Sequence, residues 1–169
     1  MWIRRLASGA GRLPDTADLS DPIIDHAGEI YQYVGDEIVV SWPLDAGLRD
    51  NNNNCIRCFF AMRAALAHQS GKYQRIYGLV PTFKAGLHCG NVTTGEIGVI
   101  KKDIIFTGDV LNTTARVQGL CNALGVDNLV SGQLVTRLGP DPSFQLRAMG
   151  PHALRGRDEQ VVLFTLDPS

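Results

Sequence analysis

The sequence predicts an α+β domain in which a mostly antiparallel sheet is covered by helices. Three observations favour this class: a hairpin signal over 29–42, an apolar helical stripe over 55–66, and a strand that runs into a helix over 103–124. Once the first residues are set aside, the expected order is helix, two strands, helix, two strands, helix and short strands. At 169 residues the chain is long enough for one domain with a sizeable core.

The N-terminal segment, 1–18, is rich in Arg, Gly and Ala and contains Pro14, so we expect it to be irregular. Residues 19–27 have the pattern of a helix end that stops at Gly28. The domain proper is expected to cover 19–166.

A β-hairpin is predicted by two short runs of β-branched and aromatic residues, 29–34 and 37–42, which flank Gly35-Asp36. After it, the Asn-rich tract 50–54 is expected not to pack, although Asn53 or Asn54 can cap the helix that follows.

That helix, expected to run to about Ser70, carries Cys55 and Cys58 as a lone C-x-x-C. A redox pair or half of a zinc site is one interpretation, but no second C-x-x-C follows to complete four sulfur ligands. Both cysteines fall on the apolar stripe, which favours buried core residues.

In the C-terminal half we expect a strand over 83–89, a second hairpin over 90–98, a strand over 103–106, and a helix over 110–124 that stops at Gly125. The remaining expected elements are strands near 128–130, 144–149 and 161–166, and a small helix near 132–138.

The composition of the chain argues against several classes of function and location. The formal net charge of −1 argues against broad nucleic-acid binding, which needs a basic face. No apolar run approaches the length of a membrane span, and the first residues are too polar for a signal peptide. With four cysteines and no such signal, a reducing cytoplasm is the expected location.

Asp36, at the hairpin turn, is either a common turn former or a ligand for a divalent cation. Asn112 and Arg116 are spaced i, i+4 and share a helix face away from the apolar stripe. This face is either solvated or suited to a phosphate, which arginine contacts at two points. Arg155, beside Gly156 in a loop before the last strand, is either a phosphate contact or part of an exposed turn.

Together these segments resemble the catalytic domain of the class III nucleotidyl cyclases, the adenylate and guanylate cyclases. The family's hairpin ending in Gly-Asp matches Gln32 to Asp36, and its G-D-x-x-N-x-x-x-R stretch matches Gly108 to Arg116. The glycine-spaced segment GLHCGNVTTGEIG and the ALRG segment resemble the family's intervening strand and its basic phosphate contact. The likeness runs from about Leu19 to Leu166.

The resemblance implies a ferredoxin-like βαββαβ core that works as a head-to-tail homodimer, with metal carboxylates of one subunit facing the Asn and Arg of the other. It implies ATP or GTP as substrate and two Mg²⁺ or Mn²⁺ ions. By position, Asp36 would be a metal ligand, Asn112 would orient the ribose, Arg116 would stabilise the transition state, and Arg155 would hold the terminal phosphates.

Base selection and the metal site depart from the family pattern. At the two base-contact positions stand Gln32, which can bond either purine, and Ile105, which can bond neither; Asp103, on the same strand face, could substitute. The family's first strand, with its second metal aspartate, is not recognisable in 1–18, so this strand is expected to be missing or replaced. The alternative to a cyclase is therefore a weak or inactive homologue that binds nucleotide or serves in dimerisation.

Overall fold

A computed structural model describes residues 2–6, 17–91, 93–97, 103–107, 109–156 and 159–169; for 2–6, 17–18, 93–97 and 103–107 the backbone alone is described. The helices, in chain order, are α1 (Ala17–Asp25), the short 3-10 helix η1 (Asn51–Asn53), α2 (Asn54–His68), α3 (Ser70–Tyr77), α4 (Asp109–Gly119) and α5 (Gly132–Val135). The strands are β1 (Trp2–Leu6), β2 (Glu29–Val34), β3 (Glu37–Ser41), β4 (Thr82–Leu87), β5 (Thr93–Ile97), β6 (Asp103–Thr107), β7 (Asn128–Ser131), β8 (Phe144–Ala153) and β9 (Gln160–Pro168).

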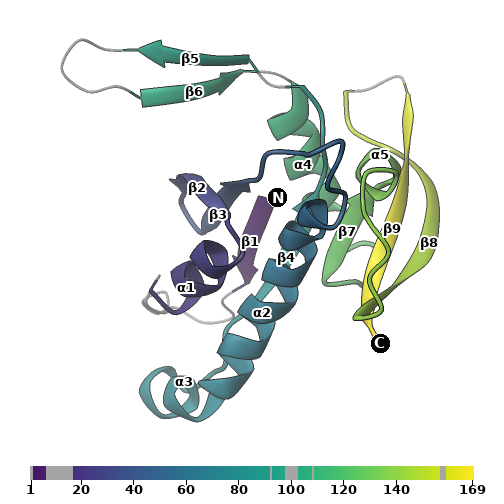
Figure 1. The fold of residues 1–169 in the computed structure, drawn as a ribbon. Helices are drawn as coiled ribbons and strands as arrows, with labels where there is room; N and C mark the ends of the chain where they lie inside the picture. The colour runs from purple at the N-terminus through teal and green to yellow at the C-terminus, as the bar shows by residue number, and fades with distance from the viewer. Residues whose placement is uncertain (1, 7–16, 92, 98–102, 108, 157–158) are drawn as a thin grey trace.

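The main sheet has seven strands in the order β2-β3-β1-β4-β7-β9-β8 (Figure 1). Only the β4–β7 pair is parallel among the described pairings of this sheet. The sheet is therefore mostly antiparallel with helices packed on it, and the predicted α+β class is confirmed.

The expectation that 1–18 is irregular throughout is wrong for residues 2–6. They form strand β1, which pairs with both β3 and β4 and so occupies the middle of the sheet. The first strand is thus replaced and not missing, and its sequence is WIRRL. A five-residue run with two arginines carries no clear sequence signal for a strand. It forms a strand here because β3 and β4 provide hydrogen-bonding partners on both sides. Residues 7–16 lie outside the described part of the chain.

The two faces of the sheet are covered by different helices. On β4, the side chains of Phe83, Ala85 and Leu87 join the cluster formed with α1 and α2. A second, smaller cluster lies on the other face, where Val117 of α4 packs with Leu129 and Leu163. Successive residues of a strand point to opposite faces, so β7 contributes to both layers, with Val130 in the first cluster and Leu129 in the second.

The expectation that the Asn-rich tract does not pack is wrong. Asn52 and Asn53 are 3% and 0% exposed, and neither caps α2 with its side chain. The Asn53 side chain exchanges two hydrogen bonds with the backbone of Gly139, at 3.1 and 3.2 Å. The buried Asn53 amide is thereby paired with the half-buried backbone of Gly139, which ties the start of α2 to the segment before β8.

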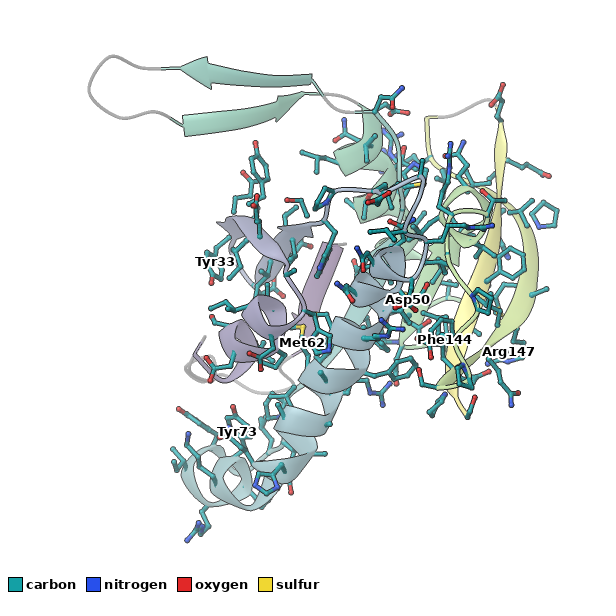
Figure 2. The ribbon with its side chains drawn as sticks, viewed as in Figure 1. Tyr33, Asp50, Met62, Tyr73, Phe144 and Arg147 are labelled. Atoms are coloured by element: carbon teal, nitrogen blue, oxygen red, sulfur yellow. The ribbon has the colours of Figure 1, made fainter. Side chains whose placement is uncertain are left out.

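A charge cluster supports the same junction. Arg57 of α2 forms ion pairs with Asp50 and Asp141, and Figure 2 shows Asp50 at the N-terminal end of α2. The Asp141 carboxylate also accepts hydrogen bonds from the hydroxyl and backbone N–H of Ser143. The hydrogen bonds from Ser143, and to a smaller extent the contact with Arg57, lower the pKa of Asp141 to about 2.

The sequence analysis expected a hairpin within residues 90–98, and this expectation is wrong. Instead β5 pairs with β6 across the segment 98–102, which lies outside the described residues. The pair is a separate two-stranded sheet that projects from the body of the domain (Figure 1). The helix α3, which the sequence analysis did not separate from α2, begins after Gln69 and ends at Gly78, whose φ is +70°. Within the described part of the chain, the helices lack the length and apolar character needed to cross a membrane.

Candidate functional site

Helix α4 presents the predicted Asn112/Arg116 pair on its outward face. Thr113, Thr114 and Val117 of the same helix are buried, whereas Asn112 is exposed and Arg116 is half-buried. The i, i+4 spacing therefore places both polar groups away from the core, as the sequence analysis predicted.

The position of α4 is fixed by a close backbone approach at Gly86 of β4. A Cβ atom at Gly86 would lie 2.6 Å from both the carbonyl oxygen of Thr114 and the amide nitrogen of Gln118. Only glycine permits this contact, since real Cβ atoms essentially never come closer than 3.0 Å to another heavy atom. The distance between α4 and the sheet, and with it the position of Arg116, therefore depends on residue 86 being glycine.

Arg116 lies against the turn between β8 and β9. A Cβ at Gly156, whose φ is +74°, would be 3.6 Å from the Nη2 atom of Arg116. Leu154, two residues earlier, is buried in the same cluster as Val117, so the turn and α4 share one apolar support. Arg155 is exposed between these two positions. The structure thus brings the predicted Arg155 segment next to Arg116; Arg157 lies outside the described residues.

The hairpin that carries the other predicted residues forms as expected. Gly35 has a φ of +58°, and Gly35-Asp36 is the tight turn between β2 and β3. Gln32 is exposed on β2, and Asp36 is partly exposed at the turn. A register shift between Ile30 and Gln32 changes the alternation on β2, which the sequence pattern did not indicate.

Within one chain, Asp36 and the turn that holds Arg155 lie at opposite edges of the sheet. The β2–β3 hairpin with Asp36 forms one edge, and the β9–β8 turn next to Arg116 forms the other. Figure 2 shows the two edge strands on opposite sides of the molecule, with Tyr33 on β2 and Arg147 on β8. From β3 to β9 there are four strand steps, or roughly 19 Å at about 4.8 Å per step. One chain therefore separates Asp36 from the turn that holds Arg155, whereas α4, which carries Arg116, lies over β4 between the two edges.

The two remaining base-contact candidates lie on β6. In the backbone register, Ile105 pairs with Gly95 and Asp103 pairs with Ile97. Both positions are thus on the projecting two-stranded sheet. Their side chains lie outside the described part of the structure, so the substitution of Asp103 for Ile105 in base contact stays a prediction.

The two-ion metal site implied by the resemblance does not fit the described residues. Among the side chains that the structure describes, Asp36 is the one carboxylate identified at the expected place, and the strand beside its hairpin, WIRRL, contains no acidic residue. The described residues also contain no group of three or more His, Cys, Asp or Glu side chains able to hold a metal ion. Two divalent ions usually need more than one carboxylate besides the substrate phosphates.

A cavity that the sequence analysis missed opens where β3 and β4 end. It measures about 610 Å³, and Trp42, His88 and Leu111 are among its lining residues. The buried Asn52 fixes its rim by donating to the carbonyl oxygens of Asp45 and Arg137, at 2.9 and 2.8 Å. The Nδ1 atom of His88 lies 2.8 Å from the Ser131 hydroxyl oxygen, so this imidazole has a hydrogen-bond partner at the cavity wall. No local pattern joins these distant segments, so the sequence offered no signal for the cavity.

The cysteines behave as core residues. Cys55 and Cys58 are buried among apolar side chains, and burial raises their pKa values to about 11 and about 12. A thiol that stays protonated is a poor nucleophile and a poor metal ligand. The core interpretation of the C-x-x-C is therefore confirmed.

Known proteins resemble this chain in sequence and in fold. A model of the adenylate and guanylate cyclase catalytic domain matches residues 23–167. Adenylate cyclase 2 of Rhizobium meliloti is 37% identical over 150 residues, which cover 89% of this chain and 41% of the relative. Adenylate cyclase 1 of the same organism is 27% identical over 149 residues, covering 86% and 22% respectively. The chain therefore spans less than half the length of these curated relatives.

Solved structures share the fold. The adenylyl cyclase CyaB from P. aeruginosa superposes with a TM-score of 0.78 at 18% identity, covering 99% of this chain and 92% of that structure. The guanylyl cyclase Cya2 superposes with a TM-score of 0.75 at 19% identity, covering 98% and 89%. With the family match over most of its length, the chain belongs to the adenylate and guanylate cyclase catalytic-domain family, the class III nucleotidyl cyclases.

Proposed function

We propose that the chain is a nucleotidyl cyclase domain that converts a nucleoside triphosphate into a 3′,5′-cyclic nucleotide and pyrophosphate, with ATP preferred over GTP. The observation that carries this proposal is the contact between Arg116 and the turn that holds Arg155 and Gly156. Arg155 directly precedes Gly156 in this turn, and Asn112 is exposed on the same helix as Arg116. Such a cluster suits a polyphosphate, which guanidinium groups bind through paired N–H donors.

In the proposed reaction, the ribose 3′-oxygen attacks the α-phosphorus while the bond from that phosphorus to the pyrophosphate oxygen breaks. Pyrophosphate leaves with the bonding electron pair, and the hydroxyl proton passes to solvent. Arg116 stabilises the charge that grows on the phosphoryl oxygens, Arg155 holds the terminal phosphates, and Asn112 orients the ribose. Fixed donors of this kind stabilise a transition state because they need no reorganisation during the reaction.

The preference for ATP is supported by the names of the relatives, several of which are adenylate cyclases. The residues alone do not separate the two purines, since the amide of Gln32 can donate to or accept from either base. We therefore propose cyclic AMP as the main product and test both nucleotides.

A homodimer is part of the proposal because Asp36 and the turn that holds Arg155 lie at opposite sheet edges. In a head-to-tail pair, the Asp36 edge of one copy would meet the Arg155 edge of the other. The projecting β5–β6 sheet supports this arrangement, since an isolated two-stranded sheet is marginally stable and gains from packing on another surface. Sedimentation velocity at increasing protein concentration should show a dimer, and a monomer at all concentrations would contradict the shared site.

The direct test is formation of cyclic nucleotide from ATP and from GTP by the purified chain. Arg116→Ala should lower the rate by about 100-fold or more, the usual effect of losing one transition-state donor. Arg75→Ala is the matched control, because Arg75 is exposed on α3 and donates only to the carbonyl of Gly71 among its described contacts. An Arg116→Ala protein that keeps the rate of the unmodified chain would refute the assigned role.

A second candidate function is a weak or inactive homologue that binds nucleotide or serves in dimerisation. The observation that favours it is the sequence of β1, which supplies no carboxylate beside Asp36. Binding of ATP without any cyclic product from either nucleotide would select this candidate.

A further inference from the structure

The cavity at the ends of β3 and β4 lies apart from the residues assigned to the nucleotide. Its volume of about 610 Å³ is within the range of small-molecule pockets. The described residues that line it do not include Asp36, Asn112 or Arg116. Helix α4 nevertheless contributes to the lining through Val110 and Leu111. The cavity therefore contacts the functional helix through residues other than Asn112 and Arg116.

The apolar side chains of the lining are held in place by their own contacts. Leu87 and Leu134 are buried in the core cluster that α1 and α2 share with the sheet. The indole Nε1–H of Trp42 donates to the carbonyl oxygen of His26 at 2.9 Å. A Cβ at Gly28 would lie 2.6 Å from the Cζ2 atom of Trp42. The indole ring is thus fixed, and its one polar atom is already paired.

The buried polar side chains of the described lining are also paired. The amide nitrogen of Asn52 donates to two backbone carbonyl oxygens, at 2.9 and 2.8 Å. The Cys55 thiol donates to the carbonyl oxygen of Asn52 at 3.2 Å, and the Thr114 hydroxyl donates to that of Val110 at 2.6 Å. The N–H, S–H and O–H donors of these three side chains are all used, so they offer no buried donor to a polar or anionic ligand.

The ionised side chains of the described lining are all exposed. They are two carboxylates, Glu29 and Asp45, and one guanidinium, Arg137. Asp45 also accepts hydrogen bonds from the backbone N–H groups of Gly47 and Leu48. Because the two carboxylates offset the guanidinium, these exposed charges do not favour an anion. A charged ligand would also lose its hydration against the apolar lining, which is unfavourable without a buried partner.

We propose that this cavity is a binding site for a small, uncharged, apolar molecule that packs against Trp42 and Leu111. The inference goes beyond the proposed function and does not rest on it, since binding can be measured without turnover. Such a ligand contacts β3, β4 and α4 together, and it stabilises the folded chain because it binds only where these elements are assembled.

The test compares two fluorescent probes that share one aromatic skeleton, using the full chain. They are N-phenyl-1-naphthylamine, which is uncharged, and 8-anilino-1-naphthalenesulfonate, which is anionic. The uncharged probe should bind saturably, with one molecule per chain, and at least about tenfold more tightly than the sulfonate. Saturating ATP should change the dissociation constant of the uncharged probe by less than about threefold.

A variant tests the location of the bound probe. Cys89 is half-buried and lines the cavity, so Cys89→Phe places a phenyl ring in the space that the probe would occupy. The affinity for the uncharged probe should fall by at least about tenfold. Val162→Phe is the matched control, because Val162 is 47% exposed on β9 and is not part of the lining. This control should bind the probe as the unmodified chain does.

The outcomes are distinct from those for the proposed function. The inference would be overturned by a lack of saturable binding of the uncharged probe, or by equal or tighter binding of the sulfonate. Competitive displacement by ATP would place the cavity within the nucleotide site and would also overturn it. So would a folded Cys89→Phe protein with unchanged affinity; if this variant does not fold, the two-probe comparison decides. Absence of cyclic product would overturn the proposed function and leave the probe measurement unaffected.

Discussion

Replacing Gly86 with alanine should displace the helix that carries Asn112 and Arg116 without changing any residue of that helix. The added Cβ would lie 2.6 Å from the Thr114 oxygen and from the Gln118 nitrogen, whereas ordinary contacts begin at 3.4 Å. Both neighbours are backbone atoms of α4, so neither can rotate away. The helix as a whole must move outward by about 0.8 Å, the difference between these distances.

The expected cost follows from overpacking of a close-packed interior, about 1–3 kcal/mol of unfolding free energy. The measurement is urea denaturation followed by circular dichroism, with the midpoint and slope analysed together. Product formation should fall more steeply than stability, because a shift near 1 Å in the position of catalytic groups costs about 100-fold in rate.

Gly119→Ala is the matched control on the same helix. Its Cβ would meet no atom within 4 Å, so the same substitution should be neutral or stabilise by up to about 1 kcal/mol through helix propensity. Equal unfolding free energies for the Gly86→Ala and Gly119→Ala proteins would refute the argument that a backbone contact at Gly86 positions α4.

Three further predictions concern the supports around the site. Asn52→Ala should lower the unfolding free energy by about 1–3 kcal/mol, because a buried amide with three hydrogen bonds is lost; calorimetry measures this, and an unchanged melting temperature would contradict it. The folded-state pKa of Asp141 is lowered to about 2 from 3.8, so its stabilisation is present above pH 3.8 and is lost as the pH falls toward 2. The slope of stability against pH in this window should shrink in an Asp141→Asn protein. Among the thiols, that of the half-buried Cys89 should react first with a disulfide reagent, and faster labelling of the buried Cys58 would argue against its core position.

The local elements of the site were predictable because their signals are short-range. The hairpin is indicated by Gly35-Asp36 alone, because a tight turn requires a residue with positive φ and glycine adopts one readily. The i, i+4 spacing of Asn112 and Arg116 likewise places both on one helix face. The family motifs consist of the same short segments, which is why the resemblance could be recognised before the fold was known. The base-contact role of Gln32 stays a prediction.

Other features could not be predicted because they depend on pairing between distant segments. The Asn-rich tract looked like a polar loop, yet Asn52 and Asn53 are buried because backbone groups near Gly139 offer partners for their amides. The strand β1 has weak propensity and forms by pairing with β3 and β4 on both sides. In both cases the stabilising contacts are made with segments that are distant in the sequence, so the local residues do not indicate the structure.

The sequence alone therefore determined the α+β class, the hairpin, the functional helix and the family, since each is written in the spacing of a few adjacent residues. Only the tertiary structure decided that Arg116 meets Gly156, that Asp36 lies at the sheet edge opposite this turn, and that a cavity opens at the ends of β3 and β4. The physical reason is strand order: which strands become neighbours depends on hydrogen bonds and burial summed over the whole sheet, and no local run of residues encodes that sum.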